Sequence, residues 1–74
     1  MNEKEFSQYW AKVEKIHALP EMAIKQLPAS LSTETKKKLM KLRPEETIGI
    51  LVAAIDQVNR GSVESIDNLV RKRL

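Results

Sequence analysis

Apolar side chains recur every three or four positions along most of this chain, and that period is typical of amphipathic helices rather than strands. Over residues 2–18 the repeat places a run of apolar and aromatic positions on one helix face: Phe6, Tyr9, Trp10, Val13, Ile16 and His17. A second, shorter pattern covers residues 20–27. We expect this second helix to stop at Pro28, because proline lacks the backbone N–H that a helix interior needs.

The third predicted helix begins after Ser32, whose hydroxyl can accept a hydrogen bond from a free backbone N–H of the first turn. Leu39 and Leu42 should face inward from this helix, with Met40 at the boundary. A fourth helix opens with Pro44 at its first position. Two glutamates follow in its first turn, where the helix dipole favours negative charge.

The fourth helix should lie at the centre of the fold, because residues 47–55 carry no charge and are apolar on most sides. We therefore expect Leu51, Val52 and Ile55 to be nearly fully buried. Burial of this helix on several sides would leave the shorter helices packed around it.

Both glycines of the chain lie in or next to this fourth helix. Gly49 stands one turn before Ala53, so a second helix could approach closely at these small residues. Gly61 suits the left-handed conformation that ends a helix. We expect Ser62 to cap a fifth helix that runs to residue 73. Its apolar stripe consists of Val63, Ile66, Leu69 and Val70.

These elements predict an all-α protein, a compact bundle of four to five short helices in one domain spanning residues 1–74. A chain of 74 residues buries only a small core. Its three aromatic residues lie within five positions, so they cannot all face inward from one helix. We expect Phe6 and Trp10 in the core and Tyr9 at its edge. The alternative is that Tyr9 is an exposed aromatic that contacts a partner.

Several classes of protein are disfavoured by composition. No apolar run approaches the roughly 20 residues that a membrane span needs. The chain has no cysteine, so it can form neither a disulfide framework nor a thiolate metal site. The first ten residues include Glu3, Lys4 and Glu5, and no apolar signal segment follows them. We expect a cytoplasmic protein without membrane contact.

Residues capable of catalysis are few and lack the neighbours that catalysis needs. The single histidine, His17, could be flanked by Glu14 and Glu21 on a continuous helix, but Pro20 interrupts that helix. The serines lack a nucleophile motif, and two glycines twelve positions apart cannot form a phosphate-binding loop. We therefore expect no enzyme, no catalytic or metal-binding residue, no cofactor and no small-molecule substrate.

Charge is distributed unevenly along the chain, whose net charge is +3. Residues 36–43 carry five bases and no acid, and residues 71–73 carry three more bases. The candidate basic interaction patch consists of Lys36, Lys37, Lys38, Lys41 and Arg43. Bases in such a cluster can contact phosphates, or they can form an ordinary solvated helix face.

Two functions are compatible with these features. The leading hypothesis is a small, non-enzymatic helical module that binds another protein or itself. The alternative is a nucleic-acid-binding or nucleoprotein accessory protein that uses the clusters at 36–43 and 71–73. A nucleic-acid surface would require both clusters to form one continuous positive patch. We instead expect acids such as Glu34, Glu45 or Glu64 to interrupt it.

Overall fold

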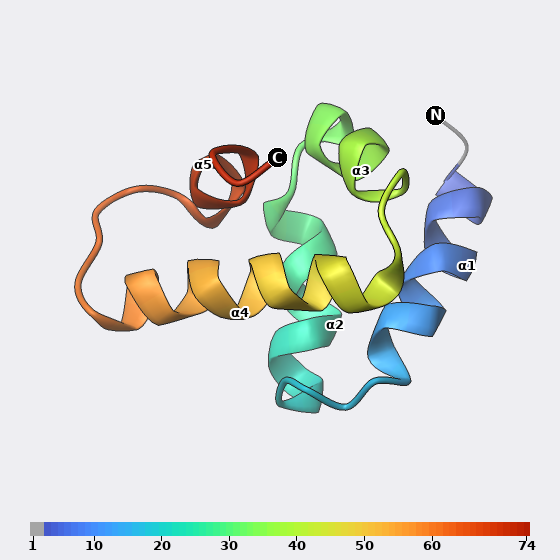
Figure 1. Cartoon of the computed structure of the whole chain (residues 1–74), viewed down its shortest axis with the longest axis horizontal. Helices are drawn as coiled ribbons and strands as arrows, with labels where there is room; N and C mark the ends of the chain where they lie inside the picture. The colour runs from blue at the N-terminus through green and yellow to red at the C-terminus, as the bar shows by residue number, and fades with distance from the viewer. Residues whose placement is uncertain (1–2) are drawn as a thin grey trace.

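The computed structural model describes residues 3–74 and shows five α-helices joined by short loops (Figure 1). In chain order the helices are α1 (Glu3–Glu14), α2 (Glu21–Ser30), α3 (Thr33–Leu39), α4 (Pro44–Asn59) and α5 (Ile66–Arg71). Within the described range there is no strand. The predicted all-α bundle is therefore confirmed.

The longest helix, α4, crosses the middle of the molecule and packs against α1 and α5 (Figure 1). Leu51 and Ala54 on its inner face are completely buried. The prediction of near-complete burial is correct for Leu51 and wrong for Val52, which is 42% exposed, while Ile55 is only partly buried. Val52 points about 100° away from Leu51 around the helix. The rest of this small domain covers that side of α4 only in part.

Where α1 packs on α2, a tryptophan of α1 donates a hydrogen bond that the backbone of α2 cannot supply. α2 continues through Pro28 to Ser30, so the predicted stop at Pro28 is wrong. Pro28 has no N–H for the carbonyl of Ile24, its partner four residues earlier. The indole Nε1 of Trp10 donates a hydrogen bond to that same Ile24 oxygen at 2.9 Å. Trp10 is buried and stacks on Phe6 with ring centroids 5.5 Å apart.

Several helix ends differ from their predicted positions. α1 ends at Glu14 rather than near residue 18, and His17 lies exposed in the left-handed region at φ +56°. The cap of α5 is Ser65, whose Oγ accepts from the backbone N–H of Asn68 at 3.2 Å. The predicted cap Ser62 instead accepts from Glu64 within an extended loop.

Two predicted turn signals are confirmed. Ser32 Oγ accepts from the backbone N–H of Thr35 at 3.2 Å and caps α3. Gly61 follows α4 with φ +96°, a conformation that a Cβ makes costly. The expected close approach at Gly49 is wrong, because Gly49 is exposed and an added Cβ would meet nothing within 4 Å.

The short α5 is held by one polar contact as well as by its apolar side. The backbone N–H of Ser32 donates to Asp67 Oδ1 at 2.8 Å, across 35 residues of sequence. Burial by itself would raise the pKa of Asp67. Hydrogen bonds from Ser32 and Thr35, together with the nearby Arg71, outweigh burial and lower this pKa below its ordinary value. Leu69 and Val70 are buried on the same helix.

The central position of α4 predicts unequal effects of truncation at two adjacent residues. Leu51→Ala should lower the free energy of unfolding by about 2–5 kcal/mol, because it leaves a cavity in the core. Val52→Ala should change it by less than about 0.5 kcal/mol, because the side chain is substantially exposed. Urea denaturation of both variants measures the difference, and equal effects would contradict the arrangement of α4.

The two glycines should respond to alanine in opposite directions. Gly49→Ala should stabilise the protein by about 1 kcal/mol, because alanine is the better helix former and the added Cβ meets nothing. Gly61→Ala should destabilise it by about 1 kcal/mol, because the backbone there is left-handed. Thermal melting of both variants tests the two signs, and stabilisation by Gly61→Ala would contradict the observed turn.

The lowered pKa of Asp67 predicts a pH dependence of stability. Asp67→Asn should cost about 1 kcal/mol or more at pH 7, because the ionised carboxylate makes the stronger acceptor. The cost should be constant above about pH 5 and shrink below about pH 4, where the unfolded carboxyl takes up its proton first. Asp56→Asn, which removes only an exposed ion pair with Arg60, is the matched control. Melting curves from pH 3 to 7 that show a pH-independent difference would contradict this role.

Candidate functional site

The basic side chains of residues 36–43 do not form one uniform surface. Lys36 is half-buried, with its Nζ 5.1 Å from the ring centroid of Phe6 on α1. The other four bases of this segment are exposed: Lys37, Lys38, Lys41 and Arg43. Lys38 lies 3.8 Å from the carboxylate of Glu34, one turn earlier on α3. An exposed pair at this distance neutralises charge without contributing much stability.

Two of these lysines line a hollow together with the end of the chain. This basic hollow has a volume of about 370 Å³ and is lined by Lys38, Lys41, Leu42, Glu46, Ile50, Arg73 and Leu74. It joins the end of α3, the first half of α4 and the C-terminal residues. Leu42 and Ile50 are partly buried and Leu74 is 41% exposed, so apolar surface lies between the cations.

Most of the C-terminal bases are held by acids of the same chain. Arg71 lies 3.4 Å from Asp67, and Lys72 forms an ion pair with Glu64. Within residues 3–74, Lys41 and Arg73 have no such partner. Acidic side chains therefore stand among the bases as the sequence predicted, and two cations that form no ion pair in this range, Lys41 and Arg73, line the basic hollow.

The members of the predicted patch divide into two groups. Lys38 and Lys41 line the basic hollow with Arg73, whereas Lys36, Lys37 and Arg43 do not. The apolar lining of the hollow was missed by sequence reasoning. Leu42 was expected to face inward from the third helix, not to line a surface hollow. The sequence feature that could have indicated this lining is Leu74, an apolar residue directly after the basic residues 71–73.

Tyr9 is partly buried at the edge of the core, as expected, and the alternative of an exposed aromatic is wrong. Its hydroxyl donates to the carbonyl of Leu42 at 3.0 Å and lies 2.5 Å from Thr47 Oγ1. Because the phenol has one proton, the Thr47 hydroxyl is the donor in the second bond. Burial raises the pKa of Tyr9, against a smaller opposite effect of Thr47. The hydrogen bond from Tyr9 thus holds the backbone of Leu42, a residue that lines the basic hollow.

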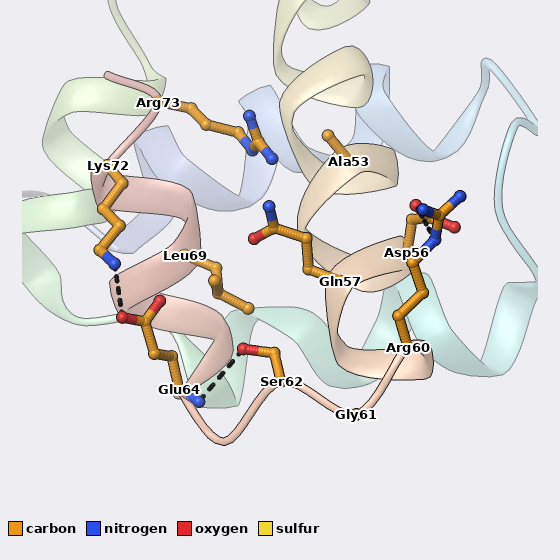
Figure 2. Close-up of a pocket in the computed structure, with 10 residues that line it drawn as sticks. All are labelled: Ala53, Asp56, Gln57, Arg60, Gly61, Ser62, Glu64, Leu69, Lys72 and Arg73. Atoms are coloured by element: carbon orange, nitrogen blue, oxygen red, sulfur yellow. Dashed lines mark hydrogen bonds and ion pairs between the residues drawn. The ribbon is translucent and has the colours of Figure 1, made fainter.

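A larger hollow of about 790 Å³ lies between α4 and α5 (Figure 2). This α4–α5 hollow is lined by Ala53, Asp56, Gln57, Arg60, Gly61, Ser62, Glu64, Leu69, Lys72 and Arg73. Both of its acids are engaged, Asp56 by Arg60 at 3.0 Å and Glu64 by Lys72. Figure 2 shows the Arg73 side chain reaching from the end of α5 toward α4. Arg73 lines both this hollow and the basic hollow.

A third, more apolar hollow of about 330 Å³ lies between α2 and the end of α4. Ala23 and Leu27 contribute from α2, Ile55 and Val58 from α4, and Ile66 from the start of α5. Its one charged lining residue is Glu64, which is already paired with Lys72. This surface offers apolar contact without a charge that would select a partner.

The structure brings His17, Glu14 and Glu21 to a small hollow of about 200 Å³. Glu21 is bound by Lys25 at 2.9 Å, and this hydrogen-bonded contact lowers the pKa of Glu21. Across residues 3–74 no three histidine, cysteine, aspartate or glutamate side chains gather closely enough to hold a metal ion. In the same range no helix is both long and apolar enough to cross a membrane.

A scan against protein-family models finds no match to the chain, and searches of curated proteins and of solved structures find no similar protein either.

Proposed function

We propose that this protein is a non-enzymatic binding module whose basic hollow holds an acidic, amphipathic segment of another protein. The observation that carries the proposal is the convergence of Lys38, Lys41 and Arg73 around Leu42, Ile50 and Leu74. Cations around apolar surface match a segment that presents carboxylates beside apolar side chains. Such charge complementarity raises the association rate and disfavours basic partners.

The composition of the hollow favours a protein segment over nucleic acid. Leu42 and Ile50 supply apolar surface that a phosphate backbone would leave unused. The pairing of Arg71 and Lys72 with carboxylates also removes two cations from any continuous positive stripe.

The size of the hollow is also suited to a short recognition segment. A volume of about 370 Å³ lies within the range of roughly 300–1,000 Å³ that is typical of ligand sites. Two or three apolar side chains of one helix turn, or of an amphipathic peptide, would occupy it. The surrounding lysines and Arg73 would then face the flanking carboxylates.

The test compares two lysines that carry the same charge but differ in position. The probe is a fluorescein-labelled helical peptide of about 15 residues with leucines at i, i+3, i+4 and i+7 and glutamates beside them. Lys41→Glu should weaken binding by about tenfold in fluorescence anisotropy. Lys37→Glu, at an exposed lysine outside the hollow, should weaken it less than about twofold, because only screened long-range charge changes.

Two further probes make the proposal falsifiable. An isomeric peptide with lysines in place of glutamates should not bind, and in NMR titrations the acidic peptide should shift the signals of Leu42, Ile50 and Leu74. Equal weakening by Lys37→Glu and Lys41→Glu, or absence of binding by the unaltered protein, would contradict a local site. Tighter binding to a DNA duplex, with a steep salt dependence, would favour the nucleic-acid function instead.

A further inference from the structure

The basic hollow and the α4–α5 hollow adjoin along one face of α4. Arg73 lines both, and the lining residues from α4 and its C-cap follow the i, i+3, i+4 and i+7 spacing of a single helix face. In chain order these residues are Glu46, Ile50, Ala53, Asp56, Gln57 and Arg60. At 1.5 Å per residue, the face from Glu46 to Arg60 is about 21 Å long. We call this continuous surface the α4 groove.

We infer that the α4 groove binds one amphipathic helix of about four turns from a partner protein, an inference that rests on the proposed function. The middle of the groove allows a backbone to approach, because Ala53 is small and partly buried. Side chains spaced by four and three residues form the rows into which the side chains of a second helix pack. A site confined to the basic hollow would leave the larger α4–α5 hollow uncovered.

The charges along the groove define the chemistry of that helix. At the Glu46 end, Lys41 and Arg73 form no ion pair within residues 3–74, so carboxylates of a partner would complement them. At the Arg60 end, the acids are already neutralised by bases of the same chain, as Figure 2 shows for Asp56 and Glu64. The partner helix should therefore be acidic in one half and uncharged in the other.

At the Arg60 end of the α4 groove, polar groups can form hydrogen bonds with the partner helix. Figure 2 shows the Gln57 amide and the Ser62 hydroxyl at this hollow, with Leu69 between the two helices. Asparagine, glutamine or serine on the partner can pair with the amide and the hydroxyl. A leucine-sized side chain can contact Leu69 and Ala53.

The experiment compares two peptides on matched variants. The long peptide has about 15 residues, acidic in one half and polar in the other, and the short peptide is its acidic half, closed by a lactam bridge to hold the helix. Ala53→Met should weaken binding of the long peptide by about tenfold and leave the short peptide unchanged, because added bulk blocks the middle of the groove. Val52→Met, on an exposed neighbour outside the groove, is the control.

The outcomes separate this inference from the proposed function. If Lys41→Glu weakens both peptides while Ala53→Met weakens neither, the site is confined to the basic hollow and the inference is wrong. If Lys41→Glu weakens neither peptide, the proposed function itself fails. Circular dichroism and melting of each variant establish that it is folded.

A second copy of this chain is the remaining possible occupant. Analytical ultracentrifugation would then show a dimer that the long peptide dissociates and that Ala53→Met prevents. Such a dimer would overturn the assignment of the groove to a different protein. A monomer that binds the long peptide more tightly than the short one is the expected result.

Discussion

The two basic segments of the candidate site are linked by a hydrogen bond from the Ser32 backbone N–H to Asp67. It joins the start of α3 to the first turn of α5, a helix of six residues that would not persist alone. Burial of Leu69 and Val70 supplies the apolar part of the same attachment. Because Arg73 lies just beyond α5, while Lys38 lies on α3 and Lys41 just after it, this attachment holds the two basic segments near each other.

The small size of the domain explains why a groove remains open beside its core. Leu51 and Ala54 of α4 are buried in the core, whereas Ile50 and Ala53 on the flank of the same helix are only partly buried. Four other short helices cannot surround a 16-residue helix on all sides. The uncovered flank lies next to the basic residues near the C-terminus, so its apolar surface and these cations adjoin, as the proposed binding of an acidic amphipathic segment requires.

Much of the fold could be predicted from the sequence, because helical periods, the Ser32 cap and the Gly61 turn depend on local chemistry. The predictions failed where contacts between residues far apart in the sequence outweighed the preference of the local sequence. Pro28 did not end α2, because Trp10 bonds to the carbonyl that proline leaves free. Val52 was expected inside because its neighbours are apolar, although only tertiary packing decides which flank of a helix is covered.

The site was less predictable, since its parts are brought together only by the fold. The sequence shows that residues 36–43 are basic, but not that Arg73 joins two of these lysines while Lys36 lies over Phe6. Charge counts are also misleading in this chain, because ion pairs neutralise Arg71 and Lys72 internally. At the basic hollow, three basic side chains and one acidic side chain stand around apolar surface: Lys38, Lys41, Arg73 and Glu46. Selectivity at such a site follows from where an unpaired cation stands, which the net charge of +3 does not describe.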